Sequence, residues 1–229
     1  MTTHKLIYFD IKGKAEALRL AFAYCKIPFE DKRFASRDEF AAMKASGALQ
    51  FGQVPALEVS SGDAKTVLTQ SVAILRYIAK LNPEAKLYPS DPVAAARVDA
   101  VCDLEADAFT GLRVSKYKAR FGFGFLDDDA NKAALAACHA SINAEVIPRH
   151  LTNLTKVLEA GGTSWLAGTA EPSIADFHWA PVLWSLTEGW SGDKDVLKAF
   201  PKLEAYVKKF YETPAVAEYY KSNDGCTIA

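Results

Sequence analysis

The sequence lacks several features that would point to a particular kind of partner. Its charges balance, with 27 Lys and Arg against 28 Asp and Glu and a formal net charge of −1. Proteins that bind nucleic acid or anionic membranes through charge are usually clearly basic. No apolar run of about 18 residues is present to span a bilayer, and the N-terminal residues lack the apolar core of a signal peptide. We therefore expect no nucleic acid or membrane partner and a cytoplasmic location.

Cysteine is scarce and widely spaced, at Cys25, Cys102, Cys138 and Cys226. No CxxC pair occurs, and no Cys/His cluster has the spacing of zinc ligands. The pattern is typical of the reduced thiols of a cytosolic protein and predicts no metal cofactor. A thiol oxidoreductase is also disfavoured, because no cysteine stands at the first junction between a strand and a helix.

The first part of the chain alternates between strand and helix patterns. Residues 5–9 have strand composition, and residues 15–24 place apolar side chains at helical spacing. Pro28 ends this helix, and residues 29–34 form a second short strand. Such a β-α-β unit predicts a parallel pair of strands joined by a right-handed crossover.

The next part of the chain has a different order of strands and helices. Residues 36–48 are polar and alanine-rich, a short helix or an ordered loop, and residues 51–59 form a strand interrupted by Pro55. A tight turn then leads to a strand at residues 65–68, and a helix begins at Ser71. The order β-α-β then β-β-α is that of a thioredoxin-like α/β domain, which we assign to residues 1–82.

The remainder of the chain has helical patterns throughout. Residues 83–92 contain Pro89 and Pro92 and are predicted to be a linker. Residues 93–229 are rich in alanine and leucine and predict an all-α domain. The expected helices are 93–120, 131–158, 172–186, 200–211 and 214–221.

One helix start in this part carries a recognisable cap. Ser173 precedes an apolar run and Asp176 follows three residues later, which is a capping box with Asp in place of Glu. We interpret this pair as structural. Replacing Asp176 is expected to cost about 1 kcal/mol or more of stability and to change binding specificity little.

Four segments are informative together: residues 5–9 (KLIYF), 12–16 (KGKAE) with Arg19, 51–55 (FGQVP) and 70–77 (QSVAILRY). In their order and spacing they resemble segments of the cytosolic glutathione transferases. The tyrosine-type classes fit best, and the sigma class most closely. The resemblance covers nearly the whole chain. It implies a thioredoxin-like N-terminal domain with a glutathione site, an all-helical C-terminal domain, an open apolar site between them, and a homodimer.

The predicted glutathione site combines two element ends. Gln70 and Ser71 stand at a helix N-terminus, where free backbone N–H groups attract a carboxylate, here the γ-glutamyl carboxylate of glutathione. Plain capping by Ser71 is the alternative. The resemblance implies that Pro55 is a cis-proline that leaves the backbone of Val54, next to Gln53, free to pair with the cysteinyl unit. An edge-strand proline without a ligand is the alternative.

Tyr8 is the predicted catalytic residue. A thiol with a pKa of about 8.5 is only a few per cent thiolate at pH 7. A phenol that donates a hydrogen bond to the sulfur favours the thiolate and lowers this pKa. A drop of about two units requires about 2.7 kcal/mol, and one charge-assisted hydrogen bond supplies about 1.5–3 kcal/mol. Without the other motifs, a half-buried strand tyrosine would be the better interpretation.

Three expected contacts depart from the family pattern. Lys14 stands where arginine is usual, so the charge remains but the planar fork is lost. Phe40 and Lys44 keep the spacing of the family's Trp and Lys contacts to the glycyl end of glutathione. Phenylalanine cannot donate the indole hydrogen bond, whereas Lys44 can still pair with the glycyl carboxylate. Solvent exposure is the alternative for Lys44.

The partner subunit is expected to contribute an acidic residue. Asp103 and Asp107 share one face of the first long helix, and the resemblance implies that Asp107 reaches the glutathione amine of the partner. Asp99 and Asp103 could equally form a solvated acidic stripe, and a metal site between subunits is a less favoured alternative. For the second substrate we name candidates near Tyr8 and on the same helix. They are Phe9, Phe109, Leu112, Arg113 and Tyr117.

The sequence thus predicts a glutathione transferase that uses glutathione as co-substrate and conjugates its thiolate to small apolar electrophiles, typically in detoxification. One rival is a glutathione-dependent isomerase, such as the prostaglandin D synthases of the sigma class, which would regenerate the thiolate. A second rival is a non-catalytic protein that binds glutathione or apolar ligands. Tyr8 with Gln53, Gln70 and Ser71 argues against lost glutathione binding.

Overall fold

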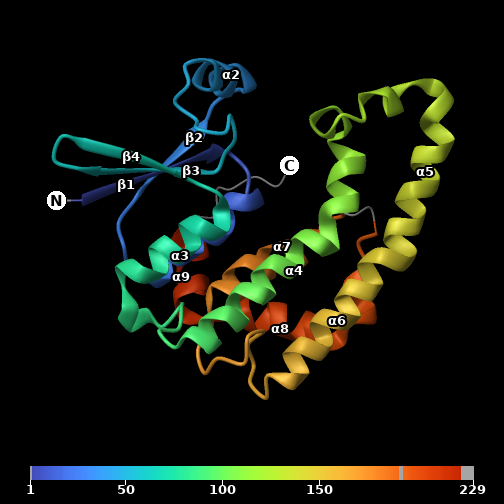
Figure 1. Cartoon of the computed structure of the whole chain (residues 1–229). Coiled ribbons are helices and arrows are strands. Elements are labelled where there is room, and N and C mark those ends of the chain that lie inside the picture. The colour runs from blue at the N-terminus through green and yellow to red at the C-terminus, as the bar shows by residue number, and fades with distance from the viewer. Residues whose placement is uncertain (1, 191–192, 223–229) are drawn as a thin grey trace.

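The computed structural model describes residues 2–190 and 193–222, and Figure 1 shows a sheet joined to a larger set of helices. The sheet has the strand order β2-β1-β3-β4. Strands β1 and β2 are parallel, with Tyr8 opposite Arg33, and the other pairs are antiparallel. The strands are β1 (Thr2–Phe9), β2 (Glu30–Phe34), β3 (Ala56–Ser61) and β4 (Ala64–Thr69).

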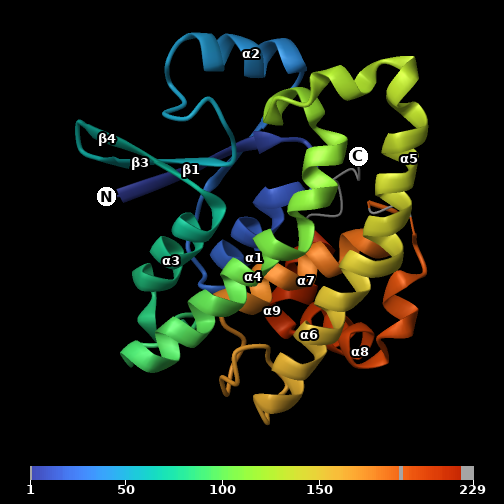
Figure 2. The ribbon, with the colours of Figure 1, turned by 45° about the vertical axis from the view of Figure 1, so that its right-hand side comes forward.

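Helices cover both faces of this sheet. Figures 1 and 2 show α2 on one side and α1 and α3 on the other, where α7 also packs against α1. The predicted thioredoxin-like arrangement is confirmed. The strand predicted across Pro55 begins only at Ala56, because proline cannot donate a ladder hydrogen bond. The helices are α1 (Glu16–Tyr24), α2 (Arg37–Ala45) and α3 (Ser71–Leu81).

The described residues of the second part form helices and connecting loops and no strand, as predicted. Its centre is α7, whose Trp179 is fully buried and donates a 2.7 Å hydrogen bond to the Val101 carbonyl on α4. The helices are α4 (Pro92–Lys116), α5 (Lys132–Ser141), α6 (Ile147–Ala160), α7 (Ile174–Thr187), α8 (Pro201–Tyr211) and α9 (Pro214–Ser222).

Two predicted helices are shorter or less regular than expected. The helix expected at 93–120 ends at Lys116, and short 3₁₀ turns follow, one of which stops at Gly122 with φ +82°. The helix expected at 131–158 contains a π-helical turn at Ile142–Val146, just before Pro148. Proline lacks the N–H that would continue the α-helical ladder, so the hydrogen-bond pattern changes there.

The predicted capping box is confirmed and is more extensive than expected. Asp176 is fully buried and accepts hydrogen bonds from the Ser173 backbone and hydroxyl, the Leu166 backbone and the Tyr206 hydroxyl, at 2.7–3.1 Å. It therefore ties the start of α7 to α8 and to the loop before it. No helix among the described residues is long and apolar enough to cross a membrane.

Candidate active site

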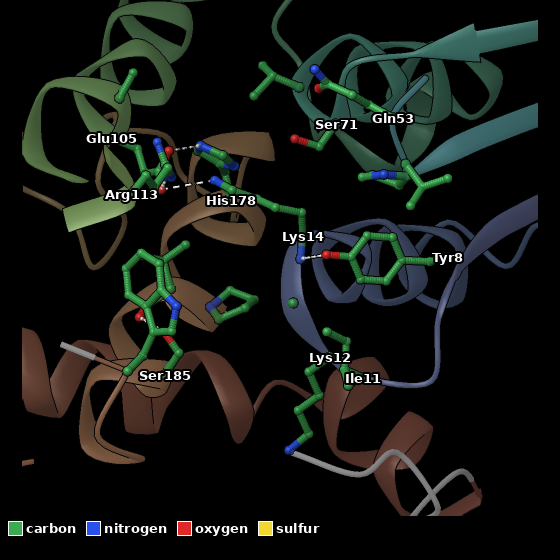
Figure 3. A pocket seen from close by; sticks show the side chains of 18 of the residues that line it. Tyr8, Ile11, Lys12, Lys14, Gln53, Ser71, Glu105, Arg113, His178 and Ser185 are labelled. Atoms are coloured by element: carbon green, nitrogen blue, oxygen red, sulfur yellow. Dashed lines mark hydrogen bonds and ion pairs between the residues drawn. The ribbon is translucent and has the colours of Figure 1, made fainter. Parts of the chain in front are cut away.

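A cavity of about 890 Å³ lies where the sheet meets the helices (Figure 3). Its walls come from the C-terminal end of β1, the loops before β3 and α3, and one face each of α4 and α7. Nine residues predicted for the site line it: Tyr8, Lys14, Gln53, Val54, Pro55, Gln70, Ser71, Arg113 and Tyr117.

Tyr8 is held with its hydroxyl at the cavity. The side chain is 8% exposed, and the backbone N–H of Lys14 donates a 3.2 Å hydrogen bond to its oxygen. Burial raises the pKa of Tyr8, and the Lys14 N–H offsets this only in part. The phenol is therefore protonated at neutral pH. Because its oxygen already accepts a hydrogen bond, its own hydrogen is available for a bound group.

Gly13 makes room for this hydroxyl. Its φ is +40°, a conformation that L side chains rarely adopt. A Cβ atom built on Gly13 would lie 2.7 Å from the Tyr8 oxygen. The glycine is thus required both by the backbone and by the approach of Tyr8.

The N-terminus of α3 opens into the same cavity. Gln70, at the N-cap, has φ +70° and ψ 113°, and its side chain makes no capping hydrogen bond. Backbone strain of this kind persists where surrounding structure enforces it, often at ligand sites. The first turn of α3 therefore presents N–H groups beside Ser71 that suit an anion.

The loop before β3 supplies an exposed piece of backbone. The Val54–Pro55 bond is cis, and the β1–β3 ladder ends at the pair of Ile7 and Ala56. Val54 consequently lies beyond the ladder, with Gln53 beside it in the cavity wall. Such a segment can pair with an extended peptide as an added strand does.

A buried carboxylate joins the two parts of the molecule at the cavity. Glu105 on α4 is 3% exposed. Its oxygens lie 2.9 Å from the Lys14 amine and 3.6 Å from His178 Nε2, and Arg113 also contacts it. Burial alone would raise the pKa of Glu105, but the His178 hydrogen bond and the charges of Lys14 and Arg113 lower it. Burial lowers the pKa of His178, so we assign a neutral imidazole.

Glu105 and His178 were missed by the sequence reasoning, although a signal was present. Cys102, Glu105, Phe109 and Leu112 recur at helical spacing on one face of α4. Glu105 is the one carboxylate on this face, and its three neighbours there are apolar. A carboxylate in such a buried position indicated an internal ion pair. Lys14, which was expected to act near glutathione, is the cation that reaches across to it.

Several predicted residues lie outside the cavity wall. Phe109 and Leu112, which are predicted to contact the second substrate, are at most 1% exposed and do not line this cavity. Phe109 packs against Trp179 and Trp190 instead, with ring centroids 6.1 and 5.4 Å apart. Their helix face is covered by α7 and the chain after it.

The remaining predicted residues lie beside the site or away from it. The centres of the Phe9 and Phe40 rings are 5.0 Å apart, so these two side chains pack against each other. The Lys44 side chain lies over Gly52, where an added Cβ would come within 2.9 Å of Lys44 Cε. It is therefore next to the Gln53 loop. Asp107 is exposed on α4 and does not line the cavity of its own chain.

Both parts of the chain match models of one protein family. Residues 4–80 match the N-terminal domain of glutathione S-transferase, and residues 119–223 match its C-terminal domain.

Within residues 2–190 and 193–222, no group of three or more His, Cys, Asp or Glu side chains is arranged to hold a metal ion.

Individual relatives agree with these matches. The chain is 30% identical over 219 residues to a glutathione S-transferase of Anopheles gambiae, covering 96% of each sequence. It is 29% identical over 228 residues to a hematopoietic prostaglandin D synthase of Gallus gallus, covering 100% of each. Among solved structures, a glutathione S-transferase specific to the nematode C. elegans superposes with a TM-score of 0.78 at 27% identity, over 97% of this chain and 98% of the other.

Proposed function

This chain belongs to the glutathione S-transferase family, and we propose that it conjugates the glutathione thiolate to small apolar electrophiles with Tyr8 as the catalytic residue. The observation that carries the proposal is the state of the Tyr8 hydroxyl. It is protonated, its oxygen accepts from the Lys14 backbone N–H, and the side chain lines the cavity. A thiolate placed there would accept a hydrogen bond from this hydroxyl and would be stabilised relative to the thiol.

The rest of glutathione would extend over the cavity wall. The γ-glutamyl carboxylate would bind the N-terminus of α3 at Gln70 and Ser71. The cysteinyl backbone would pair with Val54, between Gln53 and Pro55. Lys44 would pair with the glycyl carboxylate, while Phe40 provides only apolar contact because its ring has no donor.

Lys14 would act electrostatically rather than as a direct ligand. Its amine pairs with Glu105 at 2.9 Å, and its backbone N–H holds Tyr8. The electrophile would occupy the α4 side of the cavity, where Arg113 and Tyr117 are in the wall. Phe9 would contribute only indirectly, through its contact with Phe40.

The protein would act as a cytoplasmic homodimer in detoxification. Cys25, Cys102 and Cys138 are free thiols, which supports a reducing compartment, whereas Cys226 lies outside the described residues. Asp107 is exposed and would reach the glutathione amine of the partner subunit. Sedimentation velocity should then give a dimer, and Asp107→Asn should raise the Kd for glutathione several-fold. A monomer whose affinity for glutathione is unaffected by Asp107→Asn would contradict this part of the proposal.

A second candidate, a glutathione-dependent isomerase, is favoured by one observation. The chain matches a hematopoietic prostaglandin D synthase over its full length. Such a reaction would use the same thiolate and release it again, so glutathione would not be consumed. Measuring the concentration of free thiol during turnover separates the two reactions. Only conjugation lowers the thiol concentration in proportion to the product formed.

The decisive test is an ultraviolet titration of glutathione bound to the protein across pH, since the thiolate absorbs where the thiol does not. In the wild type the bound thiol pKa should fall well below about 8.5. Tyr8→Phe should abolish this shift and cut conjugation at neutral pH strongly, with glutathione affinity nearly unchanged. Tyr24→Phe, the same change outside this cavity, is the control. Saturable binding with an unshifted thiol pKa would favour a non-catalytic binding protein instead.

A further inference from the structure

Positive charge gathers in the cavity wall beyond the atoms needed for glutathione. The cationic side chains of this wall outnumber the carboxylates, because five stand against Asp103, Glu105 and Glu188, and His178 is neutral. The cations are Lys12, Lys14, Arg113, Lys116 and Arg120.

Two of these cations are already paired with one carboxylate. Lys14 and Arg113 both contact Glu105. Lys116 and Arg120, by contrast, form no ion pair within residues 2–190 and 193–222. The Lys116 amine donates to the Trp190 carbonyl, and the Arg120 guanidinium lies 5.8 Å from the Phe121 ring.

Lys12, Lys116 and Arg120 form no ion pair within the described residues, and the last two of these are close in the chain and distant from one of the acids. Arg113, Lys116 and Arg120 follow one another at i, i+3 and i+7 around the C-terminal end of α4. Asp103 is thirteen residues before Lys116, about 20 Å along the helix at 1.5 Å per residue. Glu188 stands on the opposing wall after α7 and offsets one charge. The net charge of the wall side chains at this end of the cavity is therefore positive.

Aromatic side chains line the same cavity wall as these cations. Tyr117 is 53% exposed although it faces the cavity, and Trp184 and Trp190 line the opposite wall. Lys12 lies 3.7 Å from the centre of the Trp184 ring, and Lys116 lies 5.3 Å from that of Trp190. Burial lowers the pKa of Lys116, a cost that a bound anion would reverse.

We propose that the second substrate of this enzyme is an apolar electrophile that carries a carboxylate, with its apolar body on Tyr117, Trp184 and Trp190 and its carboxylate on Lys116 and Arg120. This inference rests on the proposed function, since it assigns the substrate class of the same cavity. The cations determine which electrophiles bind well, and the reacting sulfur stays at Tyr8.

A matched pair of electrophiles tests the assignment. Ethacrynic acid and its methyl ester share one enone, and the carboxyl group is remote from it, so the intrinsic reactivity is similar. In both, the glutathione thiolate bonds to the β-carbon, the alkene π pair forms the enolate double bond, and the carbonyl π pair moves to oxygen. Water then supplies a proton to the α-carbon, which balances the proton that the glutathione thiol lost to solvent. Initial rates at saturating glutathione give KM for the acid and for the ester.

The expected result is a change in selectivity. The wild type should have the lower KM for the acid, and added salt should reduce this preference because the cations are partly exposed. In Lys116→Gln/Arg120→Gln the ratio of the KM for the acid to that for the ester should rise about tenfold. Lys132→Gln removes an exposed lysine of α5, paired with Asp129 and outside the cavity, and should leave the ratio unchanged.

The possible outcomes distinguish the carboxylate assignment from the transferase function. Conjugation of both compounds with an unchanged ratio in the double variant would overturn the carboxylate assignment and leave the transferase function standing. Failure of the wild type to conjugate the acid would overturn the carboxylate assignment, and the ultraviolet titration of bound glutathione decides separately whether the transferase function stands.

Discussion

The smallest group on which the active site depends is the hydrogen atom that serves as the side chain of Gly13. At φ +40°, a Cβ atom would come within 2.7 Å of the Tyr8 oxygen, so Tyr8 or the loop would have to move. A misplacement of about 1 Å at a reacting group can cost a hundredfold in rate. One backbone position thus fixes the catalytic hydroxyl.

We therefore expect Gly13→Ala to lower kcat for conjugation by about tenfold to a hundredfold. Gly62→Ala is the matched control, since Gly62 has φ +58° but open space where a Cβ atom would lie. It should share the backbone cost of about 1–2 kcal/mol and keep its activity. Steady-state kinetics and urea unfolding of both variants measure the two effects. Equal activity in the two variants would show that Tyr8 does not depend on Gly13.

Gln70 carries strain that we assign to ligand binding. Its φ of +70° is allowed for glycine at little cost. Gln70→Gly should leave the free energy of unfolding unchanged or raise it by up to about 1 kcal/mol, because relief of strain offsets the added entropy of the unfolded chain. Calorimetry should find glutathione bound several-fold more weakly. A less stable variant that binds glutathione as tightly as the wild type would contradict this assignment.

At the scale of elements, α7 depends on its first turn. Asp176 accepts from four donors in three segments, whereas an ordinary cap serves one or two. Removal of the carboxylate leaves buried donors without partners. Each unpaired donor lowers the free energy of unfolding by about 1–3 kcal/mol. The structure therefore raises the cost expected from the sequence, about 1 kcal/mol, because the residue also links α7 to α8.

We expect Asp176→Ala to lower the free energy of unfolding by about 3 kcal/mol or more. Ser173→Ala, which removes one hydroxyl from the same box, should cost about 1 kcal/mol. Urea denaturation followed by tryptophan fluorescence compares the two. Similar costs would mean that the donors from Leu166 and Tyr206 contribute little.

At the scale of the whole molecule, Glu105 holds the two parts together. It lies on α4, its partner Lys14 precedes α1, and His178 is on α7. These groups meet only when the sheet part and the helical part are docked. Breaking a buried ion pair is usually costly, although Lys14 remains about one-third exposed and the loss is smaller for that reason.

We predict that Glu105→Gln lowers the free energy of unfolding by about 2 kcal/mol at pH 7. The pKa of Glu105 is depressed in the folded state, so its contribution is present above the unfolded value of about 4.3 and is lost as pH falls below it. The wild type and the variant should therefore converge in acid. Urea titrations from pH 7 to pH 3 test this, and an advantage that vanishes already near pH 6 would contradict it.

Short-range patterns in the sequence were enough to predict the features that depend on neighbours in the chain. Strand and helix patterns, the capping box at Ser173 and Asp176, and the order of the segments at Tyr8, Pro55 and Gln70 predicted the fold class and the elements that carry the site. Each rests on backbone geometry or on contacts within a few residues. Such contacts are encoded locally, so they can be inferred without knowing how the elements pack.

Which side of each helix faces the cavity depends on how the helices pack together, and the sequence pattern did not reveal it. Helix α4 has apolar side chains on more than one face, so periodicity could not show that Phe109 and Leu112 are covered by α7 while Tyr117 is open. The contact of Lys14 with Glu105, 91 positions apart, likewise appears only on docking. Long-range packing selects among surfaces that the local pattern leaves equivalent.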